Sequence, residues 1–166
     1  MKAAPISAMY PPASGFTLIE MLVTLTVIGI LTTIALPNFK SLSQSQRVKN
    51  ASYELYSGIS LTRSEALKRN VDTTLAITTN AKNEPGWTIS AAPASGVVQI
   101  RTQDYISGVG MTATPAQIIY SGSGRTTSAA AKFQIDASGA TTPTPFVRCV
   151  SIELSGMPRI RQGVCT

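Results

Sequence analysis

Residues 15–37 read GFTLIEMLVTLTVIGILTTIALP, and Glu20 is the one charged residue in this stretch. As a helix, Phe16 to Leu36 is long enough to span the ~30 Å hydrocarbon core of a bilayer, which takes about 20 residues. A secretory signal peptide is the main alternative, but its apolar part is roughly 7–15 residues long and ends in a small-x-small cleavage site. Here the run is longer and Pro-Asn-Phe follows it, so the sequence predicts a membrane-spanning helix.

The segment before this run has a different composition. Residues 1–15 read MKAAPISAMYPPASG, with one charge at Lys2, three prolines and a terminal glycine. Such a segment cannot pack as a helix or a strand, because proline interrupts both and no apolar periodicity remains. The sequence therefore predicts a cytoplasmic leader at 1–15, a transmembrane and assembly helix at 16–37, and an exported head at 38–166.

The junction Gly15-Phe16, with Glu20 inside the apolar span, resembles the cleavage motif of type IV pilins and type II secretion pseudopilins. The resemblance implies that a prepilin peptidase in the inner membrane cuts after Gly15 and methylates the new terminal residue, Phe16. It also implies that Glu20 acts in assembly with other pilins. A carboxylate inside a membrane helix costs ~2.5–3.5 kcal/mol even on the lenient insertion scale, so Glu20 needs a partner.

Two explanations of Glu20 remain open at this point. Cleavage creates an ammonium at Phe16, and the ammonium of one subunit would neutralise the Glu20 carboxylate of its neighbour in low dielectric. Alternatively, Glu20 is a helix-start carboxylate near the headgroups, where the positive helix N-terminus favours it. Gly29 and Pro37 also fall where pilins keep helix-weakening residues. Pro37 would either kink the helix where it leaves the membrane or give the filament flexibility.

Helical periodicity continues beyond the apolar run. Residues 48–66 carry an apolar stripe with i, i+3, i+4 spacing, and most charged residues lie off it. The stripe predicts one helix from Phe16 to about Arg69, with Glu65 and Arg69 as a favourable i, i+4 pair. A coiled coil is the alternative, but the stripe lasts only about three heptads and is poor in Leu and Ile. Its members are Val48, Ala51, Leu55, Ile59, Thr62 and Ala66.

Short strand patterns replace the helical period after Asn70. Turns rich in Gly, Pro, Ser and Asn separate segments that alternate and are rich in β-branched residues. One long helix followed by short strands predicts an α+β fold, with antiparallel sheet packed against the helix. The predicted strands are 71–79, 87–90, 97–102, 117–120, 132–136 and 146–154, and the predicted turns are 80–86, 91–96, 122–124 and 137–145.

Within the pilin superfamily, the head resembles the FimU and FimT minor pilins and the H-type pseudopilin of type II secretion (GspH). The matching segments are Arg63-Ser64-Glu65-Ala66, Gly86-Trp87, residues 119–125 and a closing strand at 155–161. The resemblance implies the type IV pilin fold and a minor pilin that helps prime or cap pilus assembly. Such a subunit lies in the bacterial inner membrane, with its head in the periplasm, and reaches the cell surface on assembly. An H-type pseudopilin and a DNA-binding pilin for natural transformation are the alternatives.

The chain has two cysteines, Cys149 and Cys165. Two thiols in an exported domain are usually paired, and closing such a loop stabilises by ~3 kcal/mol in the chain-entropy model. Two free buried cysteines are the alternative. The chain has no histidine, so the usual general base is missing, and two cysteines cannot fill a tetrahedral metal shell. We therefore expect no enzyme activity, no cofactor and no metal site.

Basic residues exceed acidic ones, and the formal net charge is +6. Arg159 and Arg161 are two apart, so on a strand they share one face ~6.6 Å apart, a spacing suited to phosphates of nucleic acid. FimT-type pilins carry a Gly-Arg-x-Arg motif that binds DNA, whereas this chain has Pro158 in place of the glycine. We expect weak binding of duplex DNA through Arg159 and Arg161, helped by Arg148 or Arg125. A solvated edge strand, or a surface for docking other pilins, is the alternative.

Overall fold

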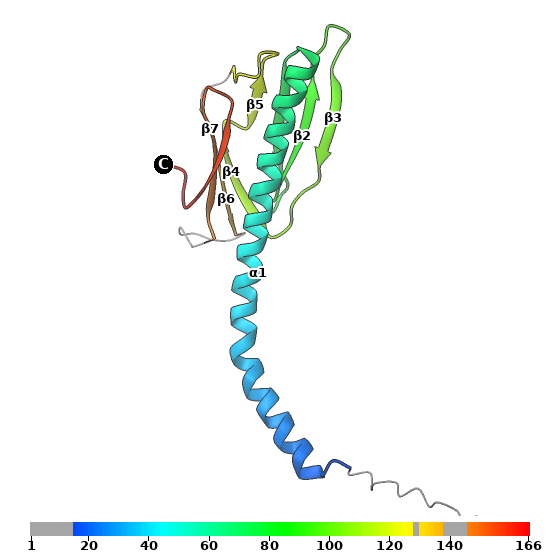
Figure 1. Cartoon of the computed structure of the whole chain (residues 1–166), viewed down its shortest axis with the longest axis vertical. Helices are drawn as coiled ribbons and strands as arrows, with labels where there is room; N and C mark the ends of the chain where they lie inside the picture. Colours follow the sequence, from blue (N-terminus) through cyan, green and yellow to red (C-terminus); the bar gives the residue numbers. More distant parts are fainter. Residues whose placement is uncertain (1–14, 128–129, 138–145) are drawn as a thin grey trace, which may run out of the picture. The chain divides into compact units, whose positions relative to one another are not determined.

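A computed structural model of the chain describes residues 15–127, 130–137 and 146–166, without the side chains of residues 34–38. The leader predicted at 1–15 therefore lies outside the described residues except for Gly15, and so does most of the turn predicted at 137–145. The chain divides into two compact units, Met1–Phe39 and Lys40–Thr166. The helix α1, Leu18–Arg69, belongs to both units (Figure 1), and the prediction of one long helix is confirmed.

Local hydrogen bonding and backbone geometry set the two ends of α1. It begins two residues later than predicted because Thr17 caps it: the Thr17 hydroxyl accepts a hydrogen bond from the Glu20 N–H at 3.2 Å. It ends at Arg69 because Asn70 adopts a left-handed conformation, with a φ of 53°. Asparagine tolerates this conformation at a helix end better than most residues other than glycine.

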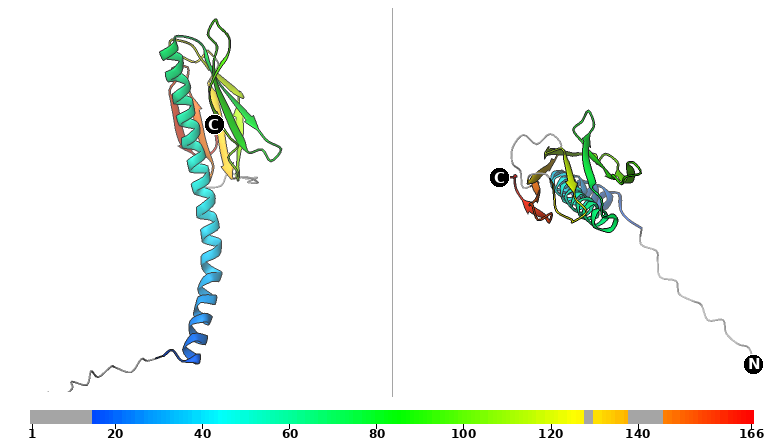
Figure 2. Two further views of the ribbon diagram at one scale, coloured as in Figure 1. Left: turned by 90° about the vertical axis from the view of Figure 1, so that its right-hand side faces the viewer. Right: turned by 90° about the horizontal axis from the view of Figure 1, so that it is seen from above.

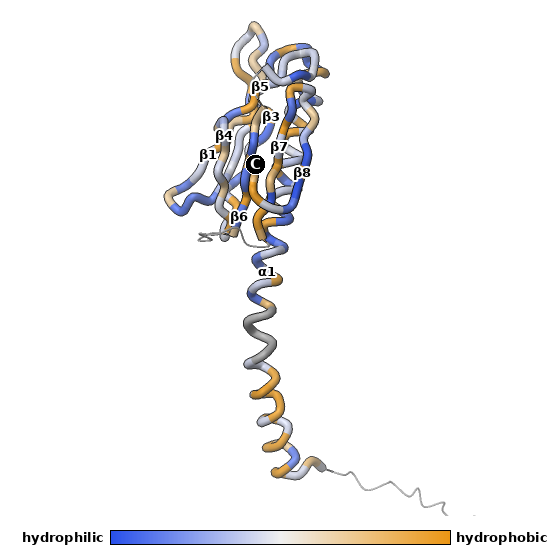
Figure 3. The backbone as a smooth tube through the Cα atoms, turned by 90° about the vertical axis from the view of Figure 1, so that its left-hand side faces the viewer, coloured by the Kyte–Doolittle hydropathy of each residue, from blue (hydrophilic) through white to orange (hydrophobic). Residues whose placement is uncertain are grey.

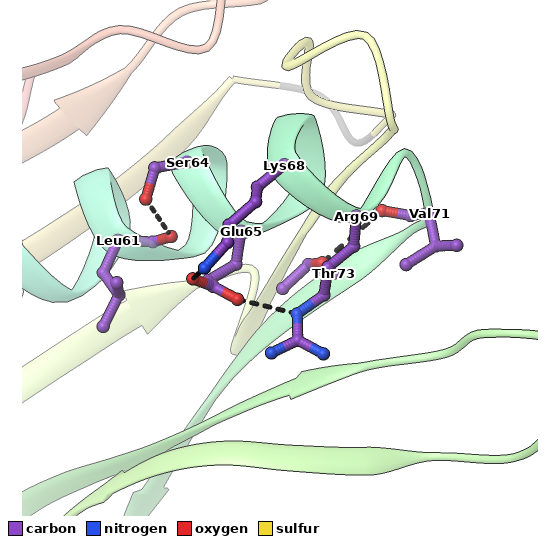
Figure 4. Close-up of polar contacts among 7 residues, drawn as sticks. All are labelled: Leu61, Ser64, Glu65, Lys68, Arg69, Val71 and Thr73. Carbon is purple, nitrogen blue, oxygen red and sulfur yellow. Dashed lines mark hydrogen bonds and ion pairs between the residues drawn. The ribbon is translucent and has the colours of Figure 1, made fainter.

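The last turns of α1 carry a small charge cluster around Glu65 (Figure 4). One Glu65 oxygen accepts a hydrogen bond from Arg69 Nε at 2.7 Å, and the other lies 3.9 Å from Lys68 Nζ. The Arg69 hydrogen bond lowers the pKa of Glu65 below its usual value, although partial desolvation acts in the opposite direction. The predicted Glu65–Arg69 pair is confirmed, and both oxygens of this carboxylate are in use.

Two four-stranded antiparallel sheets lie against the 40–69 part of α1 (Figures 1 and 2), which confirms the α+β expectation. The first sheet has the strand order β3-β2-β1-β5, and the second has the order β4-β6-β7-β8. The first four strands along the chain are β1 (Thr73–Thr79), β2 (Pro85–Ala91), β3 (Val98–Gln103) and β4 (Val109–Thr114). The last four are β5 (Gln117–Tyr120), β6 (Ala131–Ala137), β7 (Arg148–Ile152) and β8 (Pro158–Gln162).

The predicted apolar stripe forms the helix side of the core. All six of its residues are at most 1% exposed, and the five apolar ones join one hydrophobic cluster with residues of both sheets, including Leu75 and Phe133. The buried hydroxyl of Thr62 donates to the Gly58 carbonyl at 2.7 Å, so its polarity is satisfied within the helix. The stripe therefore fixes which face of α1 the sheets cover.

Some strand predictions were wrong in detail. β4 was not predicted, because Val109–Thr114 contains a glycine, an alanine and a methionine and lacks a β-branched alternation. The turn predicted at 80–86 ends earlier, since Pro85 and Gly86 pair with Thr79 and Thr78 as part of β2. β1 begins at Thr73 rather than at residue 71, and β7 is shorter than the predicted 146–154.

Candidate assembly site and basic edge strand

The bond between Gly15 and Phe16 lies in exposed, non-helical backbone just before α1. The cap explains this position, because Thr17 supplies its hydroxyl to Glu20 N–H and its carbonyl to Met21 N–H, each at 3.2 Å. The spacing Thr-x-x-Glu is that of a capping box, which favours a helix start at this place. The predicted processing bond therefore lies in exposed backbone directly before the helix, and its cleavage remains a prediction.

Glu20 lies in the first turn of α1 and is exposed. The positive end of the helix dipole favours a carboxylate there. Within the described residues, no salt bridge engages Glu20. The local geometry thus suits both explanations given above: Glu20 supports its own helix start and leaves its charge available for a partner.

Large apolar side chains are exposed along the first unit, and Figure 3 colours most of the backbone at the start of α1 as hydrophobic. Each of these side chains is at least 49% exposed, and exposed apolar surface that extends over many residues marks a site of contact with protein or membrane. Within the part of the chain that the structure describes, no helix is both long and apolar enough to cross a membrane. The predicted anchor at 16–37 includes residues 34–37, whose side chains lie outside the described residues. The exposed residues are Phe16, Leu18, Ile19, Met21, Leu22, Val23, Leu25, Val27, Ile28, Ile30, Leu31 and Phe39.

The two predicted helix-weakening positions lie within α1. No side chain comes within 4 Å of the position that a Cβ on Gly29 would take, so packing in this chain does not require a glycine there. The helix assignment continues through residue 37, and the Pro37 side chain lies outside the described ones. Their predicted role in bending the helix therefore remains a prediction.

The basic pair of the head lies on an edge strand. Arg159 and Arg161 are both exposed on β8, which among the described strands pairs with β7 alone. Strand alternation places the two on one face, opposite Ser151 and Cys149 of β7. Arg159 Nη1 lies 3.3 Å from Glu153 Oε1, but both side chains are more than half exposed. An exposed pair of this kind is worth about 0–1 kcal/mol, so it leaves Arg159 able to exchange partners.

The strand pairing separates Arg148, one of the two accessory arginines, from this pair. Arg148 is opposite Gln162, which the alternation of the strands places on the other face of the sheet from Arg159 and Arg161. Arg125 is exposed in the β5–β6 loop, directly after Gly124. A Cβ built on Gly156, in the loop before β8, would lie 2.6 Å from the Gly124 carbonyl oxygen, so the two loops touch.

A disulfide joins Cys149 on β7 to Cys165, with a Cα–Cα distance of 5.1 Å, and so confirms the predicted pairing. Two hydrogen bonds that the sequence did not reveal fasten the same tail to β6. Cys165 N–H donates to Gln134 Oε1 at 3.4 Å, and the Lys132 ammonium donates to the main-chain oxygen of Thr166. These residues share the outer face of the sheet with Arg161, so the tail covers part of that face.

Arg63 links three segments of the head, a role that its sequence position did not reveal. Its Nε donates to the Gly124 carbonyl at 2.9 Å, and its Nη1 contacts the Met157 sulfur. Beside it, the buried Tyr120 hydroxyl donates to the Gly156 carbonyl at 2.8 Å. Burial raises the pKa of Tyr120 to about 12, against a smaller opposite effect of the Arg63 charge, so the phenol stays a hydrogen-bond donor.

The described residues contain no cluster of three or more His, Cys, Asp and Glu side chains that could hold a metal ion. The polar side chains described above cap the helix, join loops by hydrogen bonds or carry charge at the surface.

Comparisons with known proteins agree with this description. A family profile described as type II transport protein GspH matches residues 51–156, well over half of the chain, and the prokaryotic N-terminal methylation motif matches residues 11–36. No curated protein sequence matches the chain.

Solved structures of the same fold include a type IV minor pilin and a minor pseudopilin of type II secretion. The type IV minor pilin FimU of Pseudomonas aeruginosa is 20% identical, with a TM-score of 0.56, covering 71% of this chain and 98% of its own. The minor pseudopilin EpsH from the type II secretion system of Vibrio cholerae is 16% identical, with a TM-score of 0.54, covering 70% of this chain and 97% of its own. At these identities the likeness concerns the fold, whereas the family profile decides membership. The chain belongs to the GspH family, within the type IV pilin superfamily.

Proposed function

We propose that the chain is a minor type IV pilin, a structural subunit that helps prime or cap pilus assembly. The observation that carries this proposal is the combination of an accessible Gly15-Phe16 bond with an ordered helix start and exposed apolar side chains directly after it. In this proposal, prepilin peptidase removes residues 1–15, and residues 16–37 anchor the subunit in the inner membrane. The head then lies in the periplasm until the subunit joins the pilus, and it carries no catalytic activity.

Electrostatics explains why processing and assembly would be coupled. Cleavage leaves an ammonium on Phe16, four residues before Glu20. Both charges are costly in an apolar helix bundle when alone, and each favours a neighbour that supplies the opposite charge. Pairing Phe16 of one subunit with Glu20 of the next would therefore fix the register between their helices.

Intact-mass measurement of the protein recovered from membranes tests the processing step. We expect the mass of residues 16–166 with one added methyl group and with the two cysteines joined. A mature terminus beyond Leu36 would mean an ordinary signal peptide and would overturn the proposal. A Gly15→Val variant is the matched control, because a blocked cut leaves the full mass while the folded head is unchanged.

An H-type pseudopilin of type II secretion is the second candidate, and the GspH profile match favours it. Both candidates share the leader, the helix and the head, so processing cannot separate them. Deletion of the gene separates them, because a pilin deletion reduces surface pili while a pseudopilin deletion blocks release of exported enzymes. We expect loss of pili with secretion intact, and the opposite result would identify the pseudopilin.

DNA binding is a further candidate, favoured by the exposure of Arg159 and Arg161 on one face of β8. Contacts of this kind go to phosphates, so binding would be independent of sequence and would weaken steeply with salt. Changing both arginines to Gln should abolish retardation of duplex DNA in a low-salt gel, with stability changed by less than ~1 kcal/mol. The exposed pair Lys68 and Lys82, changed to Gln together, is the control and should have little effect. Retention of full binding by the arginine variant would assign β8 to an edge or docking role.

A further inference from the structure

A small cavity of about 250 Å³ opens beside Arg63, between the last turns of α1 and the loop before β8. Ligand pockets for small molecules usually measure about 300–1,000 Å³, so this one suits one or two protein side chains. Its walls combine apolar and aromatic groups with a guanidinium and serine hydroxyls. The lining includes Tyr56, Ser60, Arg63, Leu67, Met157 and Pro158.

The rim of the cavity is exposed although it is apolar. Leu67 and Met157 are 50% and 51% exposed, and Tyr56 also reaches the surface. Tyr, Met and Arg are the residue types enriched at the centres of protein interfaces. The composition of this cavity therefore points to a protein partner.

Arg63 gives the cavity an unmatched positive charge. Its guanidinium is half-buried, and its two partners are the neutral Gly124 carbonyl and the Met157 sulfur, which is a weak acceptor. Within the described residues, no carboxylate forms a salt bridge with it. The nearest acidic residue along α1, Glu65, is engaged by Lys68 and Arg69 (Figure 4). A partly desolvated guanidinium favours a carboxylate, which it can bind with two parallel hydrogen bonds.

We propose that this cavity, the Arg63 pocket, receives a side-chain carboxylate next to a bulky apolar side chain from a neighbouring protein subunit. The carboxylate would meet the guanidinium and the apolar side chain would fill the space between Leu67 and Met157. Only one part of this proposal, that the partner is another subunit, rests on the proposed function. The chemistry of the pocket is independent of the processing and charge-pairing steps at the other end of the helix.

A pair of peptide probes tests this assignment on the processed full chain in detergent micelles. One probe is acetyl-Gly-Phe-Glu-Gly-amide, and the other has Gln in place of Glu. Binding is followed by NMR through the amide signals of Gly124 and Met157 and the Nε–H signal of Arg63. We expect both sets of signals to shift, and the acidic probe to bind about tenfold more tightly, as for a charge-assisted hydrogen bond.

Variants complete a double-mutant cycle. Arg63→Gln should remove the preference for the acidic probe, while Arg69→Gln, the matched control outside the pocket, should keep it. Leu67→Ala shortens the apolar wall at an exposed position and should weaken both probes equally. This variant tests the pocket even if Arg63→Gln disturbs the head.

Three results would overturn the proposal: no shift at Gly124 and Met157, equal affinity for the two probes, or an equal loss with Arg69→Gln. Each of them is compatible with correct cleavage at Gly15-Phe16. Failure of the pocket is therefore distinguishable from failure of the proposed function, which the mass measurement decides.

Discussion

Gly58 lies in the middle of α1 at the place where Trp87 of β2 packs on the helix. A Cβ added at Gly58 would lie 2.8 Å from the indole Nε1 and 3.5 Å from Leu75 Cδ1. Trp87 is only 3% exposed, so the added methyl group would have to displace a buried ring. We therefore expect Gly58→Ala to destabilise the head, although alanine is the better helix former.

The size of the effect follows from two opposing contributions. Replacing a mid-helix glycine by alanine gains roughly 0.5–1 kcal/mol from backbone entropy and propensity. Forcing an extra methyl group into a packed interior costs roughly 1–3 kcal/mol. The net loss should therefore be about 1 kcal/mol, which lowers the urea midpoint by about 0.3–1 M for ordinary m-values.

Urea unfolding of the processed chain in micelles measures this loss. Trp87 is the only tryptophan of the chain, so its fluorescence reports directly on the helix–sheet contact. Ser57→Ala is the matched control, because residue 57 is exposed on the next position of the helix and should stabilise slightly. If Gly58→Ala raises the midpoint as Ser57→Ala does, the reasoning about tight packing of Trp87 on α1 is refuted.

Three further outcomes are expected. Replacing Cys149 and Cys165 by Ser should cost ~3 kcal/mol of unfolding free energy, the value for a loop of this length, and a loss near zero would mean that packing alone holds the tail. Hydrogen bonds from Asn80 and Gly108 lower the pKa of Glu84, so its stabilising effect is present above the unfolded pKa and disappears as pH falls through the lower folded value. The difference in urea midpoint between wild type and Glu84→Gln should therefore shrink on acidification below about pH 4.5, and a constant difference would contradict this reading. Glu20→Ala should leave head stability unchanged but lower the amount of the subunit in sheared pili, with Glu54→Ala as the control, and wild-type amounts would remove Glu20 from assembly.

Periodic features of the sequence were sufficient to predict the helix, its buried face and most strands. The apolar stripe from Val48 to Ala66 could be predicted because helical periodicity alone places these residues on one face. β4 could not be predicted from the sequence, because its own residues have little strand preference and its hydrogen-bonding partner β6 lies about twenty residues away. The division of the strands into two sheets likewise depends on pairings between distant segments.

The candidate site shows the same limit. Gly15, Phe16 and Glu20 form a local motif, so a resemblance over a short stretch of sequence was enough to predict their roles. Arg63 was visible only as part of a family motif, because its partners Gly124 and Met157 lie 61 and 94 residues away. Contacts between residues so far apart in the sequence depend on the fold, and no spacing pattern in the sequence reveals them.

The disulfide has a topological consequence for the edge strand. β8, residues 158–162, lies entirely inside the covalent circle that runs from Cys149 through the turn to Cys165. An ordinary terminal strand frays from its loose end, but this one is tethered on both sides. A single protease nick at residues 153–157 would leave the pieces joined until a reductant opened the bond. The basic side chains of β8 thus lie within a covalently closed loop. Because the loop limits fraying, their spacing is kept during fluctuations that would detach a strand with a free end.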